Sequence, residues 1–309
     1  MRAFHRTAWD SCLVVAALAM FFAIHPATAT ECRPVPSERF DARDFSKGLL
    51  WKIEHQGSEP SHLFGTFHSS DPHIVTLPCP VQRVFDRSAS YSMEMLMNGA
   101  GIIAMAQAMY LDGDKTLKDV VGESVYRDTQ SALENAGVGT VEQFSRKKPW
   151  VVMLALSDSP QKGGLFLDLA LQYDATRRGI PTYGLETMAE QVAVFNGMSL
   201  EDQTLLLRDA IQHQGHMSKA MTELVDAYLR RDIDGLMQLS EKYKATDARV
   251  NSVLMDRLLV QRNKNMAERM QGRLKEGNAF IAVGALHLPG ESGLLRLLTQ
   301  AGYRVSRVY

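Results

Sequence analysis

Two matching segments near opposite ends of the chain place the strongest restriction on its fold. Leu63–His68 and Ala282–His287 each contain an apolar run, a glycine, two further residues and a histidine. A glycine at a strand end lets the chain turn sharply or approach another group closely. Because ligands collect at the carboxyl ends of strands in open α/β sheets, this pair predicts that His68 and His287 converge on one metal or substrate. The alternative is two ordinary hydrogen-bonded core histidines.

Strand-like alternation occurs near both ends of the chain, and helical periodicity fills its middle. The predicted strands cover residues 50–55, 62–64, 91–95, 181–184, 279–283 and 303–308, and the two longest helical segments cover 200–230 and 250–275. The first two strands flank a turn cluster and should form a β-hairpin. The pattern predicts an α/β fold with a central mixed sheet built from both chain ends and a large helical insertion.

The N-terminal 29 residues have the organisation of a secretory signal peptide. Arg2 and Arg6 precede the apolar run Cys12–Ile24, and an Ala-x-Ala cleavage pattern ends at Ala29. The run is shorter than the roughly 20 apolar residues that span a bilayer, so we expect cleavage and export to a periplasm or the exterior. An uncleaved anchor is the alternative.

Residues 30–309 should then form one domain, with helical insertions at about 99–160 and 199–275. No further stretch is apolar enough to cross a membrane once the signal is removed.

Composition and cysteine content narrow the classes of partner. Hydrophobic residues make up 45% and charged residues 22% of a chain whose formal net charge is -1. Such a chain, with no block of Lys and Arg, has no electrostatic signature for nucleic acid or an anionic membrane. Cys12 is lost with the signal, which leaves Cys32 and Cys79 to form a disulfide in an oxidising compartment.

Glu94 lies between methionines in the predicted strand 91–95. A carboxylate in a central strand is costly to bury unless it is paired, hydrogen-bonded or bound to a metal. With His68 and His287 it would form a His-His-carboxylate set with open positions for a divalent metal, as hydrolytic metal sites require. If the strand lies at an edge, Glu94 is simply exposed.

Three more charged residues are candidates for the site. Glu186 follows the predicted strand 181–184, where it is either a site residue or a cap for the next helix through Thr187. Arg262 lies on an apolar helix face, where it either pairs with an anion, a carboxylate such as Glu186 or a substrate oxyanion, or extends from the margin of the core into solvent. Asp168 is also a charged residue among apolar neighbours, at residues 165–169, but it is a weaker candidate for the site.

Several short motifs, in their order and spacing, together resemble the TraB/GumN family, which includes the TIKI metalloproteases. They cover nearly the whole chain after the signal and lie at residues 50–53, 63–68, 77–78, 179–187 with Gln191, 262–263, 266–267, 282–288, 293–295 and 302–303. The resemblance implies an α/β fold related to erythromycin-esterase and ChaN-like proteins. It also implies metal-dependent proteolysis with manganese or cobalt.

The resemblance assigns the metal to His68, Glu94 and His287, with Glu186 and Arg262 as further site residues. One departure is Leu286, because the second motif of the family often reads Gly-Ala-Gly-His. A bulky residue at this position is expected to narrow the pocket or change its ligand.

The leading hypothesis is therefore an exported metal-dependent hydrolase, a peptidase, with an unidentified peptide or small-molecule substrate. Glu94 would help to hold the metal, Glu186 would orient or deprotonate a water, and Arg262 would stabilise the developing oxyanion. Two alternatives stay open. One is a non-catalytic protein that binds a peptide or haem on the same scaffold, and the other is a metal-free esterase-like hydrolase that uses histidine as its base.

Overall fold

The computed structural model describes residues 32–35, 44–96, 99–157 and 165–309. The predicted signal peptide, residues 1–29, lies outside the described residues. Cys32–Tyr309 form one compact unit. Among the described residues, no helix is both long and apolar enough to cross a membrane.

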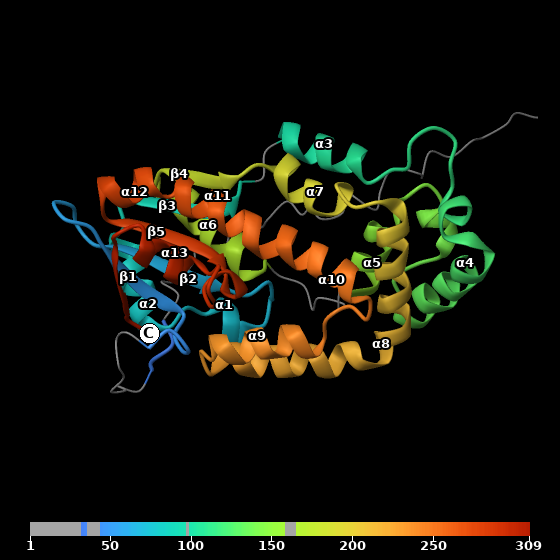
Figure 1. The fold of residues 1–309 in the computed structure, drawn as a ribbon. Helices are drawn as coiled ribbons and strands as arrows, with labels where there is room; N and C mark the ends of the chain where they lie inside the picture. Colours follow the sequence, from blue (N-terminus) through green and yellow to red (C-terminus); the bar gives the residue numbers. More distant parts are fainter. Residues whose placement is uncertain (1–31, 36–43, 97–98, 158–164) are drawn as a thin grey trace, which may run out of the picture. The chain divides into compact units, whose positions relative to one another are not determined.

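The strands of the described ranges form one mixed sheet in the order β4-β3-β5-β2-β1-β6 (Figure 1). Strands β2, β5, β3 and β4 are parallel to one another, whereas β1 is antiparallel to both β2 and β6. The bounds are β1 Leu50–Glu54, β2 Ser61–Thr66, β3 Ser90–Met95, β4 Thr182–Glu186, β5 Ala279–Gly284 and β6 Arg304–Arg307. The predicted hairpin and the α/β fold with a sheet assembled from both chain ends are confirmed.

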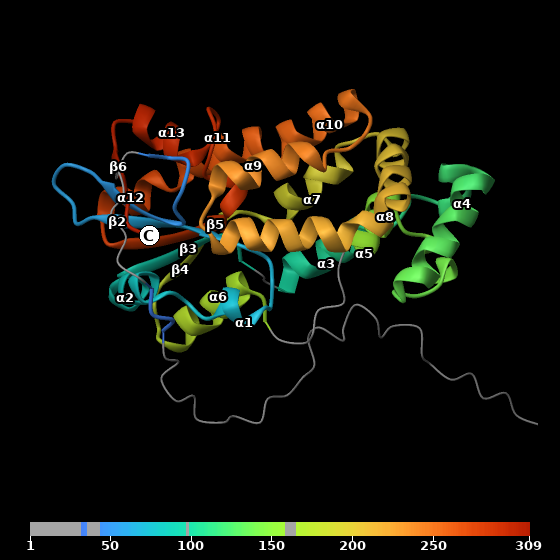
Figure 2. The ribbon, with the colours of Figure 1, turned by 90° about the horizontal axis from the view of Figure 1, so that it is seen from below.

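Helices cover both faces of the sheet. Figure 2 shows α2 and α6 on one face and α11 and α13 on the other. The helices are α1 Pro72–Val75, α2 Cys79–Arg87, α3 Gly99–Ala108, α4 Leu117–Ala136, α5 Pro149–Ser157, α6 Leu167–Arg177, α7 Met188–Asn196, α8 Leu200–Leu229, α9 Ile233–Lys242, α10 Ala248–Met255, α11 Gln261–Arg269, α12 Gln271–Glu276 and α13 Leu294–Gln300. Short 3₁₀ turns occupy Val141–Phe144 and Ala285–His287, and a π-helical turn occupies Asp256–Val260.

The composition of β5 explains its place at the centre of the sheet. Its sequence AFIAVG is apolar throughout, and its first five residues are buried. A parallel strand covered by helices on both faces has such a continuous apolar run, because neither face meets water. Strand β1, one position from the edge, alternates instead, with Lys52 and Glu54 more exposed than their neighbours.

The predicted helical segments differ from the observed helices at their breaks. The segment 200–230 ends as predicted, but Arg231 adopts a positive φ of 61° and Asp232 then caps the unpredicted helix α9. The segment 250–275 is divided into α10, the π-helical turn, α11 and α12. Strand β4 runs two residues further than predicted, so that Glu186 is its last residue.

A disulfide joins Cys32 to Cys79, as the cysteine count predicted. It links the N-terminal segment to the first residue of α2. The same segment is held by backbone hydrogen bonds, from Arg33 N–H to the Leu77 carbonyl and from Cys79 N–H to the Arg33 carbonyl. Covalent and hydrogen-bonded contacts therefore act together at this point.

We expect the Cys32→Ser/Cys79→Ser variant to lose about 2–4 kcal/mol of unfolding free energy, because the cross-link restricts a loop of the unfolded chain. Urea denaturation followed by circular dichroism measures this loss. Reductant should lower the stability of the wild-type protein by a similar amount and leave the double variant unchanged. Equal midpoints for oxidised and fully reduced wild-type protein would contradict the prediction.

Candidate functional site

The candidate site lies at the carboxyl ends of four adjacent parallel strands. Glu94 is on β3, Glu186 ends β4, His287 follows β5, and His68 lies two residues beyond β2. In the register of β2 and β5, Thr66 is opposite Gly284. The two Gly-x-x-His segments therefore leave neighbouring strands at nearly the same level, as their sequence match suggested.

Both glycines are required by close packing rather than by unusual φ values. A Cβ added at Gly65 would lie 2.7 Å from the Leu288 side chain and 3.2 Å from the Ala285 backbone. A Cβ added at Gly284 would lie 3.2 Å from Glu94 Oε1. Gly65 thus lets the second segment pack onto the first, and Gly284 lets its own N–H reach the carboxylate of Glu94.

Glu94 is held at both oxygens. Its Oε1 accepts a hydrogen bond of 2.6 Å from the Gly284 N–H, and its Oε2 accepts one of 2.6 Å from Arg262 Nη2. Burial acts to raise the pKa of Glu94, but His287, Arg262 and the Gly284 N–H outweigh it and lower the pKa to about 2. Glu94 is therefore ionised at neutral pH although it is largely buried.

Arg262 joins Glu94 to Glu186 across the ends of β3 and β4. Its Nε donates to both Glu186 oxygens at 3.0 and 2.9 Å, and its Nη2 donates to Glu186 Oε2 at 2.6 Å. Its Nη1 donates to the Leu258 carbonyl in the π-helical turn. Arg262 was expected to pair with a carboxylate or with a substrate oxyanion, or to extend into solvent, and in the structure it pairs with the carboxylates of Glu94 and Glu186.

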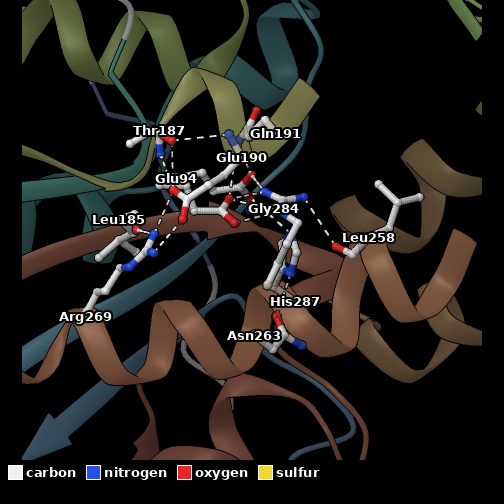
Figure 3. A network of polar contacts seen from close by, with 12 residues as sticks. Glu94, Leu185, Thr187, Glu190, Gln191, Leu258, Asn263, Arg269, Gly284 and His287 are labelled. Atoms are coloured by element: carbon white, nitrogen blue, oxygen red, sulfur yellow. Dashed lines mark hydrogen bonds and ion pairs between the residues drawn. The ribbon is translucent and has the colours of Figure 1, made fainter. Parts of the chain in front are cut away.

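His287 is buried and held in one orientation by Asn263, whose Oδ1 lies 2.6 Å from His287 Nδ1 (Figure 3). Asn263 Nδ2 donates to the Ser292 carbonyl, which fixes the orientation of the amide and makes Oδ1 an acceptor. Nδ1 therefore carries the proton. Burial lowers the pKa of His287 to about 4, so the ring is neutral at pH 7.

It follows that Nε2 of His287 presents an unshared electron pair. This nitrogen lies 3.5 Å from Glu94 Oε1, which is also an acceptor. Two electron-pair donors, neither of which carries a hydrogen, consequently lie 3.5 Å apart in buried surroundings.

His68 occupies a different environment. Its side chain is 66% exposed, and its Nε2 lies 3.3 Å from Asp168 Oδ2. Asp168 is buried, as its apolar helix face indicated, and its Oδ1 accepts a 2.6 Å hydrogen bond from the Thr66 hydroxyl. Burial raises the pKa of Asp168, against the opposing effects of His68 and Thr66.

The structure thus brings four of the five predicted site residues into direct contact: Glu94, Glu186, Arg262 and His287. The fifth, His68, contacts Asp168, although it lies near enough to influence the pKa of His287. Within the described ranges, no group of three or more His, Cys, Asp and Glu side chains lies together as a set of metal ligands.

Several contacts of the site had no clear sequence signal. Asn263 and Gln191 belong to the motifs of the family resemblance, but neither was predicted to be a site residue. Asn263 contacts His287, and Gln191 approaches Glu94 at 3.4 Å and Glu186 at 3.3 Å. The next helix, α7, is capped by Thr187 with Glu190 as its partner, so Glu186 is not its cap. The spacing Thr187-x-x-Glu190 is the capping-box pattern and could have indicated this.

Leu286 packs against the main hydrophobic core. Its bulk therefore contributes to the packing of the turn that carries His287.

Replacing Arg262 with methionine should reduce the unfolding free energy by about 3–5 kcal/mol, because Glu94 and Glu186 would become uncompensated buried carboxylates. Urea denaturation measures the change. Arg269→Met is the matched control on the same helix, because its pair with Glu190 is much more exposed. That control should lose less than about 1 kcal/mol, and equal losses in the two variants would contradict the role of Arg262.

Comparison with known proteins places this site in a family. Residues 49–307 match the model of the TraB/PrgY/gumN family. The chain is 24% identical to the metalloprotease TIKI2 of Danio rerio, over 93% of this chain and 66% of that protein. It is 25% identical to the metalloprotease TIKI1 of Homo sapiens, over 91% of this chain and 64% of that protein.

A bacterial relative is the uncharacterized protein YbaP of Escherichia coli (strain K12), which is 23% identical over 78% of this chain and 89% of that protein. The chain spans about two thirds of the length of the TIKI proteins that it matches. No solved structure gives a significant match. The family model covers most of the chain, including every residue of the site, and the chain therefore belongs to the TraB/PrgY/gumN family.

Proposed function

We propose that this protein is an exported metal-dependent peptidase in which His68, Glu94 and His287 hold a divalent metal ion. The observation that carries the proposal is the pair formed by His287 Nε2 and Glu94 Oε1. Neither atom carries a hydrogen, and the two lie 3.5 Å apart. Because such atoms repel unless a positive charge lies between them, the pair fits a cation.

The separation of these two atoms also suits a metal ion. Two ligands at about 2.0–2.2 Å from one tetrahedral ion lie roughly 3.4 Å apart. The hydrogen bond between Asn263 and His287 Nδ1 is the kind of contact that orients metal-bound histidines. Glu94 and Glu186 together carry more negative charge than Arg262 neutralises, which adds to the attraction for a cation.

His68 would supply a third donor atom. It leaves the strand next to that of His287. Its ring is mostly exposed, with Phe166 and Asp168 as neighbours, which leaves it room to adjust toward a ligand. In the described part of the chain, its Nδ1 has no hydrogen-bond partner. The set His68, Glu94 and His287 leaves room for water and substrate, as a hydrolytic site requires.

A divalent ion held by this set would lower the pKa of water and polarise a substrate carbonyl. The protein's own groups would prepare the site for that chemistry. Gly284 and Arg262 hold the two oxygens of Glu94 in place, and Asn263 fixes the tautomer of His287.

Glu186 and Arg262 act as positioning residues in this proposal. The Glu186 side chain is only 2% exposed, and both of its oxygens accept hydrogen bonds from Arg262. This arrangement favours a role in orienting Glu94 over the proton transfer and oxyanion roles considered from the sequence.

The names of the TIKI relatives support peptidase activity, and the Cys32–Cys79 disulfide supports export, because disulfides persist in oxidising compartments. Manganese and cobalt are the ions that the family resemblance implies.

The metal set is tested by titrating chelator-stripped protein with Mn²⁺ or Co²⁺ in a calorimeter and by assaying the reconstituted protein against a peptide library. We expect His68→Ala and His287→Ala each to weaken metal binding more than about 100-fold, since orienting contacts alone are worth 10–100-fold. Peptide turnover should fall with metal occupancy.

His216→Ala, an exposed histidine on α8, is the matched control and should retain metal and activity. Full metal content and turnover in both His68→Ala and His287→Ala would rule out the proposal. Retention of a peptide or haem by wild-type protein without turnover would instead favour the binding-protein alternative, and turnover in excess chelator would favour the metal-free esterase.

A further inference from the structure

Asp168, near the start of α6, carries a buried polar atom that the contacts of the site leave unexplained. Its side chain is 6% exposed, and the Thr66 hydroxyl satisfies Oδ1. Oδ2 has no hydrogen-bond partner in the described part of the chain, and its ion-pair partner there is His68 Nε2 at 3.3 Å.

A buried carboxylate oxygen without a donor is unfavourable, because it has lost its hydration and gained no hydrogen bond in return. The His68 ring lies close enough to remove this cost, because a rotation of the ring would aim an Nε2–H at Oδ2. Contacts of this kind are often long before a ligand binds and shorten afterwards. The 3.3 Å separation between His68 Nε2 and Asp168 Oδ2 is therefore short enough for a hydrogen bond once the exposed ring has rotated.

We propose that Asp168 is a positioning residue for His68: it accepts the Nε2–H and so leaves Nδ1 as the electron-pair donor toward the site. The use of Nδ1 for a metal rests on the proposed function, whereas the contact between Asp168 and His68 does not.

A parallel with His287 strengthens the inference. Each Gly-x-x-His histidine has one ring nitrogen beside a side-chain oxygen from a helix, which is Asn263 on α11 for His287 and Asp168 on α6 for His68. These two helices lie on opposite faces of the sheet (Figure 2). The two histidines would thus present opposite ring nitrogens, Nε2 from His287 and Nδ1 from His68.

Burial argues against Asp168 as a direct ligand of a metal or substrate. Its Oδ2 has essentially no solvent-exposed surface, whereas the His68 side chain is 66% exposed. A ligand that arrives from solvent therefore meets His68 first. Asp168 would act only through the imidazole, as carboxylates behind metal-bound histidines do.

The contact is tested without metal by NMR of protein labelled with ¹⁵N-histidine. In wild-type protein, the His68 Nε2–H proton should be shifted downfield and exchange slowly with water. In Asp168→Ala it should move upfield and exchange at the rate of an exposed ring. Asp174→Ala, in the same helix and paired with Arg177 and Arg178, should leave the His68 signal unchanged.

A Co²⁺ titration monitored by visible absorption supplies the second measurement. Asp168→Ala should weaken Co²⁺ binding by about 10–100-fold and change the absorption bands, while Asp174→Ala should match wild type. If Asp168→Ala does not fold, Asp168→Ser replaces it, because a serine hydroxyl can still meet Thr66 but is too short to reach His68.

The inference is overturned if the His68 Nε2–H signal is the same in wild type and in the Asp168 variant. It is also overturned if the Asp168 variant binds Co²⁺ as wild type does while His68→Ala does not. If His68→Ala itself binds Co²⁺ normally, the metal proposal fails, and the NMR result alone then decides the role of Asp168.

Discussion

The guanidinium of Arg262 is the interaction on which the site depends. It contacts both Glu94 and Glu186, which lie at the ends of neighbouring parallel strands and would otherwise repel each other in buried surroundings. Each ion loses hydration on burial, and the Coulombic gain compensates only where geometry and hydrogen bonding are nearly complete. Here Nε and Nη2 both donate to carboxylate oxygens, and Nη1 donates to a carbonyl.

Helix α11, which carries Arg262, also positions the histidine of the site. Asn263 follows Arg262 directly and holds His287, so consecutive residues of α11 position the carboxylates and the histidine. The π-helical turn immediately before them supplies the carbonyl that receives Arg262 Nη1. A π-helical turn changes the direction of the side chains that follow it, and such turns are frequent at functional sites.

The sheet was predictable because its information is local. Apolar strand runs, turn residues and the repeated Gly-x-x-His segments identified β1, β2, β3 and β5 and brought Glu94 and His287 to one edge. The breaks within the long helical segments could not be predicted in the same way. Residues 256–260 include no proline or glycine, so tertiary contacts decide where the π-helical turn forms.

Most side-chain partners of the site residues could not be predicted from the sequence either. A pair between Arg262 and Glu186 was one of the alternatives that the sequence offered, because a guanidinium on an apolar helix face can be stabilised by an anion. Asn263 and Gln191, however, are neutral residues whose distant partners leave no local pattern. The immediate neighbour of His68 was missed for a related reason, because Asp168 lies 100 residues further along the chain and nothing local connects the two.

The two histidines are matched in sequence but not in accessibility, and this difference suggests how the site is entered. His287, Glu94 and Arg262 are each at most 12% exposed, whereas His68 is 66% exposed. A rigid, neutral and buried histidine can define a binding position without reorganisation. An exposed one can move as a ligand arrives, at a cost of order 1 kcal/mol in side-chain entropy. Entry from the His68 side would therefore combine a preformed half of the site with an adjustable one.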